Sequence, residues 1–253
     1  MTDSSGSSGS SGSSESPGAP EAVRAVLFDV DGTLVDTNYL HAVTWWEAFR
    51  QAGHRVPMRD VHHAVGMGSD RLVGHLLGPD RDREQDARIA AAHGTLYAAY
   101  FPKLAALPGA AALLRAVAAR GRRVVLASSA AATELAAMRR ALDADDAIDA
   151  ATAGDDVDST KPAPDLVREA VRLAGVPARR TLFVGDTVWD MQACAAAGVP
   201  CLGVLTGGVP RADLAEAGAE EVFDGPAELL ERLDETRLAA SLPTEDRPAP
   251  GRS

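Results

Sequence analysis

The sequence predicts an α/β protein in which a parallel sheet is covered by helices on both faces and carries an inserted all-helical cap. Short apolar runs typical of β-strands alternate with Ala- and Leu-rich stretches typical of helices, and this order favours parallel pairing with right-handed crossovers. The alternation stops at residues 37–107, where no strand is evident and several helical stretches follow one another. We therefore expect a core of residues 21–36 and 108–238 around a cap of residues 37–107.

The elements of the core can be assigned in chain order. Each candidate strand is a short, mostly apolar run. These strands are Ala25–Phe28, Arg123–Ala127, Thr181–Val184, Cys201–Val204 and Glu221–Phe223. The candidate helices are richer in alanine, and Pro108-Gly109 predicts a stop before the first of them. These helices are Gly109–Arg120, Ala131–Leu142, Ala163–Ala174, Met191–Ala197 and Arg211–Ala217. Ligands of such sheets bind beyond the carboxyl ends of the strands, so the residues that follow the strands are candidates for the site.

The composition restricts the possible partners. The chain has 253 residues, 46% of them apolar, with a formal net charge of −11 and a pI near 5.0. Such a charge disfavours nucleic acid and anionic membranes. No apolar run reaches the ~18 residues of a membrane-spanning helix, and the N-terminus lacks the pattern of a secretory signal. We expect a cytoplasmic protein, a monomer or a weak homodimer.

Both ends of the chain have the composition of flexible tails. Residues 1–20 are almost entirely Ser, Gly, Pro and acid, and residues 239–253 are rich in proline. Such segments cannot bury enough apolar surface to offset the entropy lost on ordering. We therefore leave both tails out of the predicted fold.

Two carboxylates, Asp29 and Asp31, follow the first candidate strand directly. Residues i and i+2 of a strand point to the same side, so both acids can face one reacting group and one cation. Gly32 and Thr33 then favour a turn with accessible backbone N–H groups. Because two neighbouring anions repel each other, the pair predicts a hard divalent cation with oxygen ligands, Mg²⁺.

Three further motifs place polar residues at or near other strand ends. Ser128 and Ser129 follow the strand at Arg123–Ala127 and can bind phosphate oxygens together with the next helix N-terminus. Lys161 stands just before a helix and can supply positive charge. The candidate site also includes two acids that follow the strand at Thr181–Val184, namely Asp186 and Asp190.

With these motifs in this order, the chain resembles a haloacid dehalogenase superfamily hydrolase with a helical cap, of the phosphoglycolate phosphatase and β-phosphoglucomutase type. The resemblance covers nearly everything except the tails. It implies a Rossmann-like core and a Mg²⁺-dependent phosphatase that hydrolyses a small phosphorylated metabolite, a phosphate monoester, through an aspartyl-phosphate intermediate. The motif residues are Asp29 with Asp31, Ser128, Lys161, and Asp186 with Asp190.

The resemblance also implies a role for each motif residue. Asp29 is the nucleophile, and Asp31 is the acid for the leaving alcohol and then the base that activates water. An approaching phosphate would raise the pKa of Asp31, whereas Mg²⁺ and Lys161 would keep Asp29 ionised. The Mg²⁺ ligands are Asp29, the backbone carbonyl of Asp31 and Asp186, with Asp190 supporting the metal directly or through water. Ser128, Lys161 and N–H groups near Gly32 would stabilise the transferring group.

Three residues of the cap are candidates for contact with substrate. His41 stands where related enzymes often have a histidine, although a lone histidine is commonly structural. Ser69 and Arg71 belong to a Gly-rich turn that resembles the substrate-contacting loop of the cap. Arg71 could bind an anionic leaving group or could lie on the surface.

Other functions fit the motifs less well. A dehalogenase is disfavoured because that branch lacks the acid corresponding to Asp31. A β-phosphoglucomutase remains an alternative, but the last cap helix has Thr95 and Tyr97 where a lysine would be expected. The non-enzyme alternatives are a phosphoacceptor signalling module, which is about half this length and has no cap, and a catalytically silent binding protein.

Overall fold

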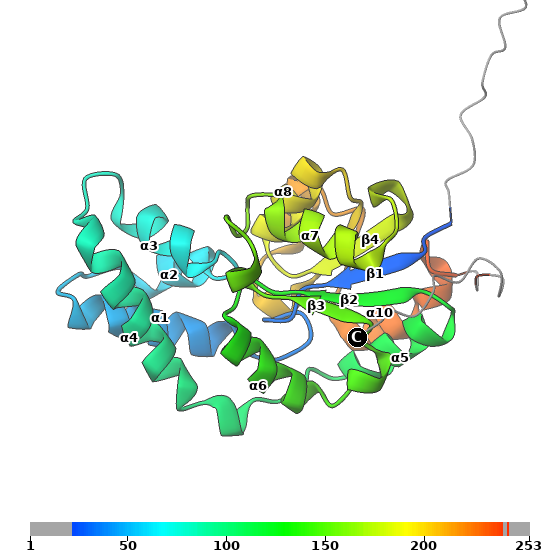
Figure 1. Ribbon diagram of the computed structural model, residues 1–253, viewed down its shortest axis with the longest axis horizontal. Coiled ribbons are helices and arrows are strands. Elements are labelled where there is room, and N and C mark those ends of the chain that lie inside the picture. The colour runs from blue at the N-terminus through cyan, green and yellow to red at the C-terminus, as the bar shows by residue number, and fades with distance from the viewer. Residues whose placement is uncertain (1–21, 240–241, 243–253) are drawn as a thin grey trace, which may run out of the picture.

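The computed structural model describes residues 22–239 and 242, and it contains one parallel sheet of six strands. The order across the sheet is β3-β2-β1-β4-β5-β6. The chain builds outward from β1 to one edge, returns to β4 beside β1, and then builds to the other edge. The strands are β1 (Ala25–Phe28), β2 (Arg123–Ala127), β3 (Ala150–Thr152), β4 (Thr181–Gly185), β5 (Cys201–Val204) and β6 (Glu221–Phe223). Their carboxyl ends face the helical cap (Figure 1).

The register aligns the ends of the three central strands. Phe28, the last residue of β1, pairs with Leu126 of β2 on one side and with Val184 of β4 on the other. All residues of these three strands are buried, and burial on both faces favours continuous apolar runs over alternation. Polar residues that follow these strands are thereby held at one edge of the sheet.

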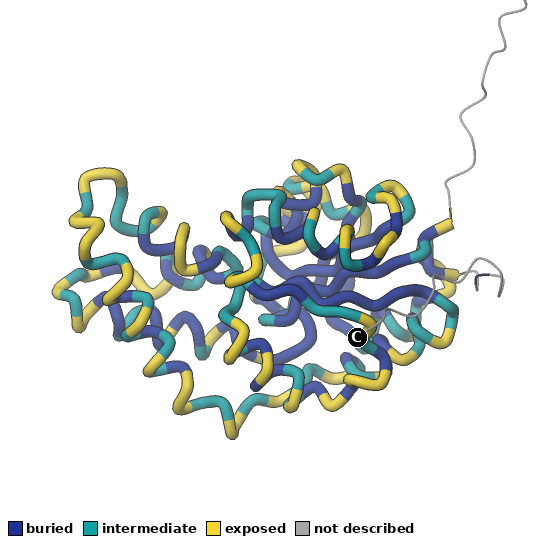
Figure 2. The backbone as a smooth tube through the Cα atoms, viewed as in Figure 1, coloured by how far each residue is buried: buried dark blue, intermediate teal, exposed yellow. Residues whose placement is uncertain are grey.

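Helices cover both faces of the sheet (Figures 1 and 2). One apolar cluster joins the sheet to α5, α6 and α10 and includes Leu113, Leu135 and Leu229. A second cluster joins the opposite face to α7, α8 and α9 and includes Leu166 and Met191. The helices of the core are α5 (Ala110–Ala119), α6 (Ala132–Leu142), α7 (Asp165–Ala174), α8 (Val188–Ala197), α9 (Arg211–Ala217) and α10 (Pro226–Glu231).

Four helices between β1 and α5 form the cap, which has its own apolar core. Trp45, Phe49, Leu72 and Ile89 pack together there. The cap helices are α1 (Asn38–Gln51), α2 (Met58–Ala64), α3 (Ser69–Leu77) and α4 (Asp86–Ala98). Short 3₁₀ turns complete the fold at Arg83–Gln85, Phe101–Lys103, Asp145–Ala147, Gly154–Asp156, Ala178–Arg180, Leu205–Gly207 and Leu233–Glu235.

The predicted fold class is confirmed, and so are the five predicted strands, one of which extends by a residue to Gly185. Two elements of the structure were not predicted. β3 has only three residues, two of them alanine, and α10 has only six residues. The alanines of β3 do not favour a strand, and the six residues of α10 make fewer than two helical turns. The predicted tails lie outside the described residues, apart from residues 239 and 242.

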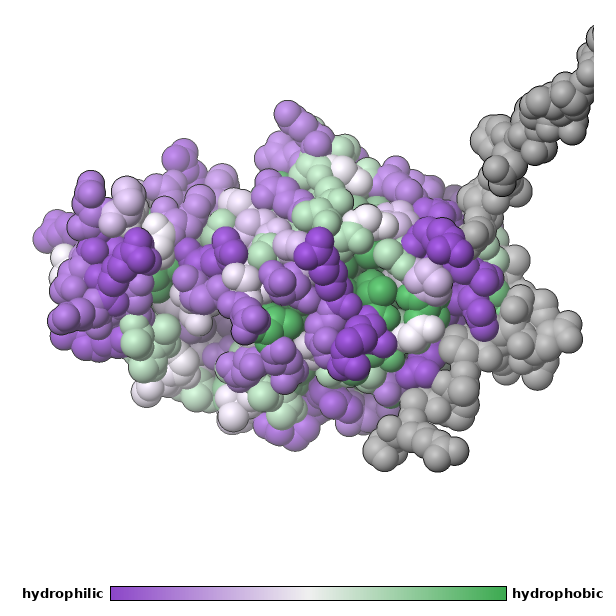
Figure 3. All heavy atoms as spheres, turned by 45° about the horizontal axis from the view of Figure 1, so that its top comes forward, coloured by the Kyte–Doolittle hydropathy of each residue, from purple (hydrophilic) through white to green (hydrophobic). Residues whose placement is uncertain are grey.

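The face of the molecule drawn in Figure 3 is mainly hydrophilic. Purple, hydrophilic residues dominate the cap in Figure 3, and apolar residues appear on the core in scattered groups. No helix within the described part of the chain is both long enough and apolar enough to span a lipid bilayer. Cys194 and Cys201 are free and buried, as expected for structural thiols.

Candidate active site

The aligned strand ends bring residues from distant parts of the sequence to one place. Asp29 continues beyond β1, where its backbone N–H donates to the carbonyl of Val184 at 2.9 Å. Ser128 continues beyond β2 in the same way, donating to the carbonyl of Thr152 at 3.1 Å. Asp186 comes directly after β4. The parallel register therefore gathers these three side chains at one edge of the sheet.

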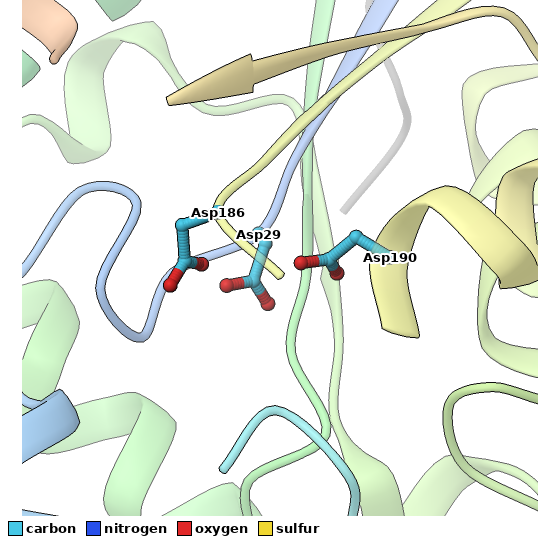
Figure 4. A group of neighbouring side chains, drawn as sticks. All are labelled: Asp29, Asp186 and Asp190. Atoms are coloured by element: carbon cyan, nitrogen blue, oxygen red, sulfur yellow. The ribbon is translucent and has the colours of Figure 1, made fainter. Parts of the chain in front are cut away.

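Three buried carboxylates meet at this edge: those of Asp29, Asp186 and Asp190. One oxygen of each lies within 4.8 Å of the corresponding oxygens of the other two. Figure 4 shows the Asp29 carboxylate between the other two, with Asp186 following β4 and Asp190 projecting from α8. The excess of negative charge here needs compensation.

Lys161 supplies part of that compensation. Its side chain is 1% exposed, and its ammonium contacts both Asp29 and an oxygen of Asp190, the latter at 2.7 Å. Burial alone would lower the pKa of Lys161, but Asp190 and Asp29 raise it above its ordinary value. Lys161 is thus held as a cation between two of the three acids.

Asp186 is fixed by hydrogen bonds from two buried donors. The Thr33 hydroxyl donates to Asp186 Oδ1 at 2.8 Å, and the Asn38 amide donates to Oδ2 at 2.7 Å. Two glycines permit the close approach of backbone and carboxylate. A Cβ on Gly207 would lie 1.9 Å from Asp186 Oδ2, and one on Gly32, where φ is +73°, would lie 2.5 Å from it. Any larger side chain at these glycines would displace Asp186.

Asp190 has a structural role as well as a place in the site. Its Oδ2 accepts from the Thr187 hydroxyl at 2.7 Å and from the Thr187 backbone N–H at 3.0 Å, which caps the N-terminus of α8. Its Oδ1 faces Lys161 instead. A Cβ on Gly185 would lie 2.6 Å from the Asp190 carboxyl carbon, so a glycine is required there.

The donor set fits a hard divalent cation. Three carboxylates and one ammonium leave a formal excess of two negative charges in a buried site. Burial and the neighbouring Asp29 and Asp190 raise the pKa of Asp186 well above its ordinary value, which is the signature of anions that lack sufficient compensation. Carboxylate oxygens are the ligands that Mg²⁺ prefers. Asp29, Asp186 and Asp190 can therefore hold such an ion.

Asp31 is turned toward the cap, where His41 of α1 contacts it. His41 Nε2 lies 2.9 Å from Asp31 Oδ1, and His41 Nδ1 lies 3.1 Å from Nε2 of His93 on α4. The His93 ring stacks on Trp45 with 4.0 Å between centroids, and the His41 ring stacks on Tyr97 at the same distance. Both histidines are buried, so the packing of the cap fixes the orientation of His41 against Asp31.

The two acids after β1 differ in protonation. Burial raises the pKa of Asp29 to about 7, with Asp190 and Asp31 adding to the effect and Lys161 opposing it. Burial would also raise the pKa of Asp31, but His41 lowers it below its ordinary value. The pKa of Asp29 is thus above that of Asp31 in the protein without a bound cation or phosphate. A divalent cation beside Asp29 and a phosphate beside Asp31 would act in the opposite directions on the two groups.

The serines after β2 lie on the opposite side of Asp31. The Ser128 hydroxyl is 3.3 Å from Asp31 Oδ2 and accepts from the backbone N–H of Ala130 at 3.0 Å. Ser129 lines the cavity, and its hydroxyl is buried without a hydrogen-bond partner among the described residues. A phosphate oxygen would satisfy that hydroxyl.

The polar groups of the turn after Asp31 form hydrogen bonds within the protein, which the sequence did not indicate. The Gly32 N–H donates to the Val35 carbonyl at 2.8 Å. The Thr33 hydroxyl is buried and lies between Asp186 and Asp29. In this structure the side chain of Thr33 and the N–H of Gly32 therefore support the site from within.

A cavity of about 300 Å³ lies between the cap and the core. Asp29, Asp31 and His41 line it from the reactive end, and Ser69 lines it from the cap. Arg71 is not among the lining residues. Its guanidinium donates to the Ser159 hydroxyl at 2.8 Å, outside the cavity.

Three residues of the site were not predicted from the sequence: Asn38, His93 and Glu134. Asn38 stands at the start of α1 and binds Asp186, His93 stands behind His41, and Glu134 of α6 lines the cavity. Glu134 stands three residues after Ala131, a position typical of helix capping, so its sequence pattern indicates only a helix N-terminus. None of the three belongs to a strand end, where a polar residue stands out against apolar neighbours.

Comparison with known proteins decides the family. A model of haloacid dehalogenase-like hydrolases matches residues 23–198. A phosphoglycolate phosphatase from Rhodospirillum rubrum is 34% identical over 219 residues, which cover 81% of this chain and 89% of that enzyme. The chain belongs to the haloacid dehalogenase-like hydrolase family. The predicted family and the prediction of a phosphatase-type hydrolase are confirmed.

Solved structures of the family share the fold. A hydrolase from Pseudomonas syringae matches with a TM-score of 0.80 and 31% identity, over 84% of this chain and 98% of that one. A variant of CbbY from Rhodobacter sphaeroides, in complex with xylulose-1,5-bisphosphate, matches with a TM-score of 0.67 and 28% identity, over 82% and 96% of the two chains. The arrangement of a capped parallel sheet is thus common to all three.

Proposed function

We propose that this chain is a Mg²⁺-dependent phosphatase that hydrolyses the phosphate monoester of a small metabolite through an aspartyl-phosphate at Asp29. The observation that carries the proposal is the asymmetry of the two acids after β1. Asp29 lies among Lys161, Asp186 and Asp190, as a nucleophile beside a cation site would, whereas Asp31 is hydrogen-bonded to His41. One acid is thus placed for attack and the other for proton transfer.

In the first step, an oxygen of Asp29 forms a bond to phosphorus and the bond from phosphorus to the leaving oxygen breaks. With the phosphate bound beside it, Asp31 carries a proton and gives it to that leaving oxygen, and His41 orients the carboxyl group for this transfer. Lys161, Ser128 and the free hydroxyl of Ser129 stabilise charge on the transferring group.

In the second step, Asp31 takes a proton from water, and the resulting hydroxide attacks phosphorus and releases Asp29. A bound Mg²⁺ would compensate the charge of the phosphate and the carboxylates. Asp29, Asp186 and the backbone carbonyl of Asp31 would hold this ion, with Asp190 in support. The closed cap would exclude bulk water from the first step.

The size of the cavity and the named relatives support a small phosphorylated substrate. About 300 Å³ is at the lower end of the range of small-molecule sites, which is roughly 300–1,000 Å³. One relative is named a phosphoglycolate phosphatase, and the CbbY structure holds xylulose-1,5-bisphosphate. Both compounds are phosphate monoesters of small alcohols.

Hydrolysis is favoured over a mutase reaction. The last cap helix offers His93 to His41, while the side chain of Thr95 is exposed and donates to the Ala91 carbonyl at 2.8 Å. The side chain of Tyr97 stacks on His41. No lysine of α4 reaches the cavity, because the helix contains none.

The test is phosphate release from p-nitrophenyl phosphate with Mg²⁺, comparing the unmodified protein with Asp29→Asn. We expect the substitution to lower the rate at least ~10³-fold, since it removes the nucleophile and keeps its shape. Equal rates from the two proteins would overturn the proposal. With β-glucose 1-phosphate, free phosphate should form in place of glucose 6-phosphate, which a mutase would produce.

A further inference from the structure

The cavity that would hold the leaving group has an unusual charge pattern. Its lining residues include three acids, Asp29, Asp31 and Glu134, and no lysine or arginine is found among the described residues that line it. Among the described residues that line it, the basic side chains are His41 and His93, and His41 is paired with the Asp31 carboxylate at 2.9 Å. Burial and the neighbouring His41 lower the pKa of His93 well below its ordinary value, so His93 adds no positive charge.

Glu134 is the acid at the leaving-group end. It projects from the first turn of α6 toward α4, where its Oε1 would lie 3.9 Å from a Cβ on Gly94. Burial raises its pKa, with Asp31 adding to the effect, while His41 and the backbone N–H of Ala131 oppose it. Any further anion in the cavity would face this carboxylate across low-dielectric space.

The cations around the cavity are already paired or directed elsewhere. Lys161 lies behind Asp29 and is paired with it and with Asp190. Arg71 and Lys103 are sequence neighbours of lining residues and contact other groups. Arg71 donates to Ser159 and lies 3.8 Å from Asp70. Lys103 lies over the ring of Tyr100, 5.7 Å from its centroid. Neither is placed to compensate a carboxylate or a second phosphate on the leaving group.

The rest of the lining suits an uncharged, hydroxyl-bearing group. Thr133 and Ser69 offer hydroxyls, and Glu134 itself can accept hydrogen bonds from the substrate. Apolar side chains form the remaining wall, which would contact the carbon skeleton. They are Trp45, Val65, Met67, Ala90, Ala98 and Phe101.

We propose that Glu134 is a specificity-determining residue that rejects leaving groups with a second anionic group, so that the enzyme takes monoesters of uncharged, hydroxyl-bearing alcohols. The inference rests on the proposed phosphatase function and narrows its substrate class. It distinguishes this chain from its named relatives, because phosphoglycolate carries a carboxylate and the xylulose-1,5-bisphosphate bound by CbbY carries a second phosphate. Rejection by a fixed like charge is a common source of specificity.

The test uses pairs of substrates that match in size and differ in charge. The first pair is 2-hydroxyethyl phosphate and 2-phosphoglycolate, and the second is glycerol 3-phosphate and 3-phosphoglycerate. For the unmodified protein with Mg²⁺, we expect kcat/KM to be at least ~10-fold higher for the uncharged member of each pair. Glu134→Gln keeps the shape of the side chain and the oxygen that accepts from the Ala131 backbone N–H. We expect it to lower the ratio of the two kcat/KM values at least ~5-fold, because the KM for the anionic member falls.

Two variants serve as controls. Glu47→Gln removes a carboxylate from the cap outside the cavity lining and should leave the ratio unchanged. Arg71→Ala should also leave it unchanged, because Arg71 contacts Ser159. A selective loss of activity toward 2-phosphoglycolate in Arg71→Ala would show that this arginine binds the anion, and would overturn the proposal.

The remaining outcomes separate this inference from the proposed function. Two outcomes would overturn the role of Glu134 alone. One is phosphate release with a preference for the anionic members. The other is a ratio that stays unchanged in Glu134→Gln while circular dichroism shows a native fold. If Glu134→Gln does not fold, the ratio of the unmodified protein still decides the substrate class. Absence of release from all four compounds and from p-nitrophenyl phosphate would overturn the function and the inference together.

Discussion

His93 acts on Asp31 only through His41, so it is a positioning residue. It lies 3.1 Å from His41 Nδ1 and stacks on Trp45. His93→Phe retains the stacking and loses the hydrogen bond. We expect it to lower kcat about 10-fold with little change in KM. This loss is smaller than the rate factor of ~10²–10⁴ that general acid catalysis supplies. His93→Gln, which can still bond to His41, should recover part of that loss. Equal kcat values for the Phe variant and the unmodified protein would contradict this role.

Asp186 shows how a proposed metal ligand can lower the stability of the metal-free protein. Its buried carboxylate is costly without a cation, as its raised pKa indicates. In Asp186→Asn the new amide can still accept from Thr33, and Asn38, whose Oδ1 has no partner among the described residues, can turn to accept from it. We expect the melting temperature without metal to rise by about 2–4 °C, or ~1 kcal/mol, and the stabilisation by Mg²⁺ to disappear.

Calorimetry with and without Mg²⁺ measures both effects. Glu169→Gln, which removes a carboxylate paired with Arg172 on the outer surface of α7, is the matched control and should keep the Mg²⁺ effect. A metal-free Asp186→Asn protein that melts well below the unmodified one would show that the carboxylate is well compensated without a cation.

At the residue level, the sequence predicted the positions that follow strands. Asp29, Ser128 and Asp186 each interrupt an apolar pattern where a parallel sheet places its ligands, and the structure brings them together. His93 and Glu134 sit within Ala-rich helices. His93 contacts His41, which is 52 residues away in the sequence, and Glu134 of α6 faces Gly94 of α4, so no local pattern reveals either residue.

Polar groups away from the reacting residues also join the cap to the core. The Gly68 N–H donates to the Thr160 hydroxyl at 3.1 Å, and that hydroxyl donates to Asp70. A further contact joins α2 to α8, where the Trp189 indole donates to the His63 carbonyl at 2.9 Å. Because Thr160 precedes Lys161, cap closure and the placement of the ammonium are linked along the chain.

Asp70→Ala should therefore weaken closure of the cap. We expect KM to rise about 3- to 10-fold with a smaller change in kcat, because one hydrogen bond to a charged group contributes ~1.5–3 kcal/mol at most. Steady-state kinetics with p-nitrophenyl phosphate measure both constants. Asp60→Ala is the control, since Asp60 pairs only with its neighbour Arg59 in the described residues. An equal effect of both variants would contradict the specific role of Asp70.

At the level of elements, composition and length together decided what could be predicted. Strands with bulky apolar residues were predicted, including the three-residue β6, and so were core helices of seven or more residues. The alanine-rich β3 and the six-residue α10 were not. Helix boundaries differed by up to three residues, as at α8, which begins at Val188 because Thr187 and Asp190 cap it. The hydrogen bonds of such caps depend on side-chain geometry that the sequence does not specify.

At the scale of the whole molecule, the proposed binding of Mg²⁺ would be coupled to pH. The raised pKa values of Asp29, about 7, and of Asp186 mean that both groups carry protons in the metal-free protein at moderately acidic pH. Mg²⁺ must displace those protons, so its binding becomes stronger as pH rises through the folded-state pKa values. We expect the rise in melting temperature caused by Mg²⁺ to be larger at pH 8 than at pH 6. An effect that is equal at both values, or larger at pH 6, would contradict this account of the site.

The most direct measurement is chemical trapping of the phosphorylated residue. The unmodified protein and Asp31→Asn, whose second step should be slowed, are mixed with a ³²P-labelled monoester and Mg²⁺, quenched in acid, reduced with borohydride and analysed by mass spectrometry. The account predicts a label that hydroxylamine removes, and homoserine at position 29 after reduction. A label on another residue, or turnover with no labelled protein in either sample, would contradict it.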